Sequence, residues 1–349
     1  MTITHRRPRT LAATAAAAIA ALALGSLTAC GSTAQATKAS DGSTIVRYQS
    51  YAGSVDTLQL AAALGKLPGI TLHKEGDVTG GPASLQALVS NQIDISAQAF
   101  FGAIAQVVAT GAPIKAIVAT YGTNAQTSSA IVALKSSPLT SDPHSLIGKK
   151  VAVNTLGANA EAVLDTWFTK SGLTPDQVKQ VTLVALPPLN TLQALKQGQV
   201  DAAYVSSGQL RVANAAVPLK TLTTDAKVIG YYNGGGVSLR TDWINNNAAV
   251  SKTLASGIGY ADDYIASHTR AQVLAIYDAW LKSNGYGDEV DAVDQNWSGS
   301  TGVSTKGGSI SDHDISIWLT WLGGRGDVDL SKITSSDVYT NSLNGEAGK

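Results

Sequence analysis

Short apolar runs alternate with segments of helical apolar spacing along most of the chain. Residues 45–48, Ile-Val-Arg-Tyr, have the character of a strand that breaks at residues 50–54, after which residues 55–64 have helical apolar spacing. This order predicts a strand, a loop and the start of a helix. Repetition of such units is typical of a mainly parallel sheet with helices on both faces. The pattern therefore predicts an α/β fold.

The same unit recurs in two series. The first series adds a turn and helix start at 80–84, a strand at 93–96 that runs on into 97–100, a helix around 104–108 and a strand at 114–118. The second series has strands at 149–153, 181–186 and 200–205, and helices over 160–171 and 189–196. Thr174, Pro175 and Gln177 form a helix-capping signature within it. The second series therefore repeats the strand, turn and helix order of the first.

The first 29 residues have the pattern of an export signal rather than of a folded element. Three arginines, Arg6, Arg7 and Arg9, precede an uncharged apolar run over 11–24. A run of about 14 residues is too short to span a membrane, which takes roughly 20, and is typical of a signal peptide. The arginine pair leaves Sec and twin-arginine export both open.

The signal ends in Leu-Thr-Ala-Cys-Gly at 27–31, which resembles the bacterial lipobox. In a lipobox the cysteine is lipidated through its sulfur and becomes the new N-terminus. An ordinary secretory signal with a stray cysteine is the alternative, but Cys30 is the only cysteine and sits where lipidation needs it. Residues 30–43 have no apolar periodicity, which predicts a flexible, lipid-anchored tether.

Composition narrows the chemistry of the remaining body. The chain has 25 basic and 25 acidic residues, and the signal removes three arginines, leaving 22 against 25. Nothing in this balance attracts nucleic acid. His73, His144, His268 and His313 are scattered, without the spacing of a zinc site. The chain has no nucleophile elbow and no phosphate-binding loop. We expect no catalytic residue, metal or cofactor.

Residues 148–208 resemble the second lobe of the nitrate, sulfonate and taurine-type solute-binding proteins of ATP-driven (ABC) importers. The resemblance is carried by a strand, a small-residue turn, a helix that ends in Gly-Leu, and the phrase Ala194-Leu195, Gly198 and Val200-Asp201-Ala202. Residues 87–95 repeat that phrase. The resemblance implies a two-lobed, periplasmic-binding-protein-like (type II) fold, in which each lobe is a mainly parallel sheet flanked by helices and two crossing strands join the lobes.

The resemblance also implies that the first lobe is discontinuous in sequence. Since residues 44–349 exceed the size of about 250–300 residues at which single cores split, two lobes also suit the length. We place the first part of lobe 1 at 44–129, lobe 2 with its crossing segments at 130–240, and the C-terminal part of lobe 1 at 241–349. The crossings are expected near 130–136 and 236–243.

The expected binding site lies beyond the carboxyl ends of the strands, where the following helices point unpaired N–H groups into the crevice. Such helix starts attract anions without a basic side chain. For any single turn, ordinary helix capping by its Ser, Thr, Asn or Gly residues is the alternative. The candidate ligand-binding residues at these turns and strand ends are Ser50, Tyr51, Gly81, Ser84, Gln98, Phe100, Tyr121, Thr155, Gly157, Asn159, Tyr204 and Ser206, with Tyr232 as a further aromatic candidate.

These features predict the substrate-binding component of an ABC importer. It would be a monomer, held at the outer membrane surface by the lipid on Cys30, which delivers a small organic anion such as a sulfonate, taurine or nitrate to the permease. A neutral pyrimidine-like ligand is the alternative for the site. A ligand-sensing or partner-docking surface lipoprotein is the alternative role. An enzyme like the fungal pyrimidine-synthesis relatives is disfavoured, because their cysteine-rich motif and histidines are absent from the sequence.

Overall fold

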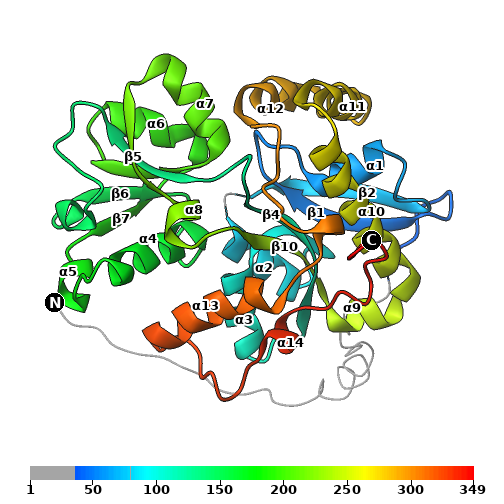
Figure 1. Cartoon of the computed structure of the whole chain (residues 1–349). Helices are drawn as coiled ribbons and strands as arrows, with labels where there is room; N and C mark the ends of the chain where they lie inside the picture. The colour runs from blue at the N-terminus through cyan, green and yellow to red at the C-terminus, as the bar shows by residue number, and fades with distance from the viewer. Residues whose placement is uncertain (1–35, 79) are drawn as a thin grey trace, which may run out of the picture. The chain divides into compact units, whose positions relative to one another are not determined.

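Strands and helices alternate through the part of the chain that the computed structural model describes, residues 36–78 and 80–349 (Figure 1). The expected signal peptide, the lipobox and Cys30 lie outside these residues. No helix in the described part is both long and apolar enough to cross a bilayer.

Two five-stranded sheets organise the fold. The first sheet has the order β2-β1-β3-β10-β4, with β1 (Thr44–Ser50), β2 (Ile70–Asp77), β3 (Ile95–Phe100), β4 (Ile114–Thr123) and β10 (Tyr232–Arg240). The second has the order β7-β6-β8-β5-β9, with β5 (Ala130–Leu134), β6 (Lys150–Val153), β7 (Thr182–Ala185), β8 (Ala202–Val205) and β9 (Leu219–Thr224).

The longer helices are α1 (Thr57–Ala63), α2 (Gly81–Val89), α3 (Phe101–Ala109), α4 (Asn159–Lys170), α6 (Pro188–Lys196), α7 (Ser207–Ala216), α10 (Ala248–Ser267), α11 (Arg270–Ser283), α12 (Val290–Asn296) and α13 (Asp312–Arg325). Shorter ones are α5 (Pro175–Val178), α8 (Asp225–Val228), α9 (Thr241–Asn246) and α14 (Ser335–Val338), with 3-10 turns at Pro143–Leu146, Gly287–Glu289 and Lys306–Gly308.

Each sheet contains one strand that runs against the others. β10 pairs antiparallel with both β3 and β4, and β5 pairs antiparallel with both β8 and β9. The pairs β1–β2, β1–β3, β6–β7 and β6–β8 are parallel. Both reversed strands are the first that the chain forms after passing from the other sheet. The predicted α/β fold with two mainly parallel sheets is therefore confirmed.

Alternating side chains of the second sheet pack into two hydrophobic cores, one on each face of the sheet. Ile131 packs with residues of α4, such as Trp167, on one face, whereas Val132 packs with Leu195 of α6 on the other. Figure 1 shows the same arrangement, with α4 on one side of the sheet and α6 on the other. Since a strand points successive side chains to opposite faces, this apolar run is buried on both.

The C-terminal helices complete the first sheet. One face of the sheet packs with α1, α10 and α11, whereas the other packs with α2, α3 and α13. Trp318 of α13 is buried there against the rings of Phe100 and Tyr232. The first sheet thus takes its strands and helices from both ends of the chain.

Strand β10 is buried along its whole length and carries three consecutive glycines, 234–236. The ladder shifts register at these residues. A Cβ atom on Gly236 would lie 2.0 Å from the carbonyl oxygen of Val118, and one on Gly235 would lie 2.2 Å from that of Ala99. The backbones of β3, β10 and β4 therefore approach too closely for any side chain at these two positions.

The chain passes between the sheets earlier than expected. β4 ends at Thr123 and β5 begins at Ala130, so the first passage lies at 124–129. The return passage lies at 225–231, between β9 and β10. The expected crossing segments, 130–136 and 236–243, instead contain β5 and much of β10. The physical reason is polarity, because residues 124–129 carry mainly polar side chains, whereas β5 is apolar and buried.

Residues 36–43, which we assigned to the tether, fold against the first sheet. The N–H of Ile45 donates to the carbonyl of Thr37 over 2.9 Å, and Lys38 Nζ donates to Thr44 Oγ1 over 2.7 Å. The N–H of Ala36 donates to Asn247 Oδ1 over 3.2 Å. Backbone hydrogen bonds need no apolar periodicity, which is why the sequence pattern did not predict this turn.

Candidate functional site

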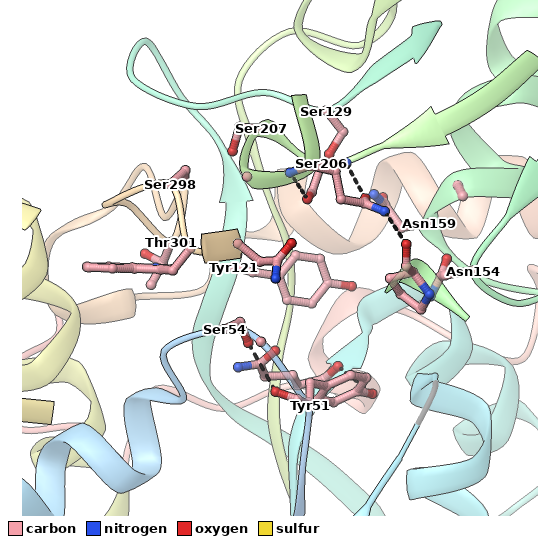
Figure 2. A pocket seen from close by; sticks show the side chains of 18 of the residues that line it. Tyr51, Ser54, Tyr121, Ser129, Asn154, Asn159, Ser206, Ser207, Ser298 and Thr301 are labelled. Atoms are coloured by element: carbon pink, nitrogen blue, oxygen red, sulfur yellow. Dashed lines mark hydrogen bonds between the residues drawn. The ribbon is translucent and has the colours of Figure 1, made fainter. Parts of the chain in front are cut away.

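A cavity of about 560 Å³ lies where the strand ends of the two sheets meet. Much of its lining comes from residues at or just after the carboxyl ends of strands in both sheets, such as Tyr51 after β1, Phe100 in β3, Thr123 in β4, Asn154 after β6, Ser206 after β8 and Asp225 after β9. In Figure 2, Tyr51 and Ser54 lie on one side, Ser206 and Asn159 on the other, and Tyr121 between them.

Most of the expected site residues line this cavity. They are Tyr51, Gly81, Gln98, Phe100, Tyr121, Asn159, Tyr204 and Ser206, together with Tyr232. Because parallel strands all end at one edge of a sheet, turns far apart in sequence meet there. The binding of a ligand by these residues stays a prediction.

Two expected residues lie in the protein interior, behind the cavity wall. Ser84 is fully buried in α2 and donates from Oγ to Ser96 Oγ over 2.9 Å. Ser50, the last residue of β1, donates to Asp77 Oδ1 over 2.9 Å. Ser84 falls on the helix face that packs against β3, so its hydroxyl supports the sheet and is not among the lining groups.

Two further expected residues, Thr155 and Gly157 in the turn after β6, lie beside the lining, although Asn154 of the same turn is part of it. The Thr155 side chain packs against Gly80, close enough that a Cβ there would lie 2.7 Å from Thr155 Cγ2. Gly157 has a φ of 69°, and its N–H donates to Glu161 Oε2 over 2.8 Å. This turn therefore positions α4 and contacts the start of α2.

Four helices begin at the cavity without a capping side chain, and in one of them, α6, the first residue is Pro188, which has no N–H. The N-cap residues of α2, α3 and α4 are Gly80, Phe100 and Ala158, and none of them accepts a hydrogen bond from its helix through a side chain. The first N–H groups of these helices lack intrahelical partners by geometry. The site thus offers backbone donors and the positive ends of four helix dipoles.

A buried carboxylate that sequence reasoning missed lies at the same place. Asp225 Oδ2 accepts from Thr123 Oγ1 over 2.7 Å and from the hydroxyls of Tyr204 and Tyr232 over 3.4 Å each. Asn159 Nδ2 donates to the Tyr204 hydroxyl over 3.0 Å. Asp225 follows β9, a strand that we did not predict, so no sequence signal marked it as a strand end.

Burial dominates the electrostatics of this group. Burial raises the pKa of Asp225, while hydrogen bonds from Thr123, Ser129, Ala226 and Tyr204 act against that shift. Burial also raises the pKa values of the tyrosines in the lining, namely Tyr51, Tyr121, Tyr204 and Tyr232. The phenols therefore stay neutral at physiological pH and can donate hydrogen bonds.

The loop after α12 closes one side of the cavity and was also missed. Trp297, Ser298 and Thr301 line the cavity, and Arg270 Nε donates to the carbonyl of Trp297 over 3.0 Å. Its composition is that of the other turns, but it follows a helix and so falls outside the strand, turn and helix pattern. Within the described residues, no three His, Cys, Asp or Glu side chains gather as a metal site requires.

The model of the family described as NMT1/THI5 like matches residues 78–285, more than half of the 349 residues. The chain belongs to the NMT1/THI5-like family. The family type that residues 148–208 indicated is thereby confirmed, since solved structures with the fold of this NMT1/THI5-like chain include sulfonate-binding and nitrate-binding proteins. No match was found among curated protein sequences.

Three solved structures with this fold each cover 86–87% of the chain. The alkanesulfonate-binding protein SsuA from Xanthomonas axonopodis pv. citri, bound to MOPS, is 18% identical, with a TM-score of 0.65 over 87% of this chain and 100% of that one. The periplasmic nitrate-binding protein NrtA from Synechocystis PCC 6803 is 16% identical, with a TM-score of 0.65 over 86% and 87%. The ligand-binding component of an ABC-type import system from Staphylococcus aureus, with zinc bound, is 14% identical, with a TM-score of 0.65 over 87% and 99%.

Proposed function

We propose that this chain is the substrate-binding component of an ABC importer, which captures a small solute in the cavity and delivers it to a membrane permease. The observation that supports this role is the cavity itself. Its volume of about 560 Å³ falls within the range of small-molecule sites, and strand ends from both sheets line it. The names of the SsuA, NrtA and S. aureus proteins describe solute binding by other chains of this fold.

One end of the solute is proposed to be anionic, as in a sulfonate, a carboxylate or nitrate. The support is the set of three helix starts at Gly80, Phe100 and Ala158, whose N–H groups face no capping side chain. Helix starts of this kind bind anions through backbone donors and the helix dipole.

Thermal unfolding tests the binding role directly. The purified protein, without its expected signal peptide, should be titrated with sulfonates, carboxylates, nitrate, amino acids and pyrimidines. A compound at 100 times its Kd should add about 2.7 kcal/mol to the free energy of unfolding, which raises the melting temperature measurably. If no compound in such a panel raises it, the solute-binding role is contradicted. If only uncharged pyrimidines do so, the anionic end is wrong but the role stands.

Contact between the second sheet and the loop after α12 should be needed for tight binding. Gly208, at the start of α7, lies against Asn296 so closely that a Cβ would sit 1.6 Å from the Asn296 carbonyl oxygen. Gly208→Ala should therefore keep these segments apart. It should lower the affinity for any compound that binds by at least about tenfold, or roughly 1.4 kcal/mol. Isothermal titration calorimetry measures this change in Kd.

Gly287→Ala is the matched control, because its Cβ would meet its nearest neighbour at an ordinary 3.6 Å. It should leave the Kd unchanged. Equal affinities for Gly208→Ala and the parent protein would show that this contact is not part of the bound form.

Membrane attachment through Cys30 is a further part of the proposal. Its support is the lipobox-like sequence at 27–31, preceded by a signal-peptide pattern. Cys30→Ala should abolish acylation and move the protein from the membrane fraction to the soluble fraction. Labelling with a fatty-acid analogue in a bacterial host measures this. Unchanged labelling of the variant would contradict lipidation at this residue.

A further inference from the structure

We infer that the solute carries a protonated amine, which binds at the Asp225 carboxylate. This inference rests on the proposed function and adds a second, cationic end to the solute. It starts from the charges in the cavity wall. Among the described residues that line the cavity there is no lysine, arginine or histidine, whereas two acids, Asp77 and Asp225, are present.

The two acids differ in their partners. Asp77 Oδ1 lies 2.7 Å from Lys74 Nζ, which also pairs with Glu289, and accepts from Ser50 Oγ, so Asp77 already has a cationic partner. Asp225 is 1% exposed and forms no ion pair within residues 36–78 and 80–349. It is held by neutral donors alone, so no counter-charge offsets the burial that raises its pKa, and a cation beside it would favour its ionised form.

Tyrosine side chains lie next to this carboxylate. Tyr204 and Tyr232 direct their hydroxyls at Asp225, and Tyr121 lines the same cavity. Tyr121 packs on the glycines of β10, where a Cβ on Gly235 would lie 2.5 Å from its ring. Its hydroxyl has no hydrogen-bond partner in the described part of the chain, and Figure 2 shows the ring reaching between the two sides of the cavity.

An amine suits this environment better than the alternatives. A second anion beside Asp225 would be repelled in a medium of low dielectric constant. A neutral group would leave the carboxylate without a counter-charge, whereas an ammonium group forms charge-assisted hydrogen bonds to it. With an anionic end at the helix starts and an amine at Asp225, the solute would be a zwitterion.

Matched pairs of compounds test the amine in the parent protein. Each pair differs only in an amino group against a hydroxyl: 2-aminoethanesulfonate and 2-hydroxyethanesulfonate, alanine and lactate, and an aminomethyl- and a hydroxymethylpyrimidine. In at least one pair the amine should bind about 10- to 100-fold more tightly by calorimetry, the range expected for a hydrogen bond to a charged group.

Asp225→Asn should remove this preference and leave the amine and its hydroxyl partner within about threefold of each other. Asp56→Asn is the matched control, since Asp56 is also a buried acid but does not line the cavity. It should keep the parent's preference. Far-UV circular dichroism checks that each variant folds, and the pair comparison in the parent protein stands even if Asp225→Asn does not fold.

Equal binding of amine and hydroxyl compounds would overturn the inference, as would an Asp225→Asn variant that keeps the full preference. The inference would also be wrong if the only compounds that bind are ones without an amine. The solute-binding role would then still stand. If none of the six compounds binds, the inference fails, and the wider panel of sulfonates, carboxylates and pyrimidines decides separately whether the chain binds solutes at all.

Discussion

Gly236→Ala should destabilise the protein by more than about 3 kcal/mol, the upper range for inserting atoms into a packed core. The added Cβ would lie 2.0 Å from the Val118 carbonyl oxygen and 2.9 Å from Ala119 Cα, and both are backbone atoms that cannot rotate away. β10 would have to leave one of its two neighbouring strands. Urea unfolding followed by circular dichroism measures the loss as a lower midpoint.

Gly324→Ala gives the opposite expectation for the same chemical change. Gly324 lies in α13, and a Cβ there would have no heavy atom within 4 Å. Alanine in a helix is favoured over glycine by about 0.5–1 kcal/mol, so this variant should be slightly more stable. A Gly236→Ala protein as stable as Gly324→Ala would mean that β3, β10 and β4 are not packed as described.

Asp56→Asn should change how stability depends on pH. Asp56 is 1% exposed and caps α1, where its Oδ1 accepts from the N–H groups of Leu58 and Gln59, while Oδ2 has no partner. Burial raises the pKa of this carboxyl from 3.8 to about 6. In the unfolded chain the group titrates near pH 4.

The raised pKa fixes the sign of the effect. Below about pH 4 the carboxyl is protonated in both states, and between pH 4 and 6 only the folded state keeps the proton. Stability from this group is therefore lost as the pH rises through that window, by about 3 kcal/mol in full above pH 6. Asparagine cannot ionise but keeps the capping oxygen, so the stability of the variant relative to the parent should rise by about that amount between pH 4 and 8.

Urea unfolding at several pH values measures this difference. Asp56→Ala should show the same pH trend but lie about 1 kcal/mol lower throughout, because it also lacks the cap. Parallel stability curves for the parent and Asp56→Asn would mean that the carboxyl titrates normally.

Sequence patterns predicted strands at β1, β3, β4, β6, β7 and β8, and missed β2 and β9. The apolar runs at 114–118 and 149–153 are strands β4 and β6, and Thr174 caps α5 as expected. β2 was missed because its residues alternate between half-buried and exposed, as suits the edge of a sheet. The reversed directions of β5 and β10 were not predicted either, since strand direction depends on which sheet the chain has just left.

Site residues could be predicted where they follow or end a strand that the sequence pattern itself predicted. Tyr51, Tyr121 and Asn159 follow or end recognisable strands or turns and line the cavity. Asp225 and Trp297 could not be found in this way, because one follows an unpredicted strand and the other follows a helix. Ser84 was expected in the site but faces the core, because a polar residue in the first turn of a helix can point either way.

The place of β10 between β3 and β4 sets an order on how the nascent chain can assemble. The second sheet uses only residues from Ala130 to Thr224, so all its strands are available before β10 leaves the ribosome or a translocation pore. β4 joins the first sheet only through β10, about a hundred residues later in the chain. Its edges therefore stay unpaired over that interval, and a chain stopped before Tyr232 would expose an apolar strand open to aggregation or to chaperone binding.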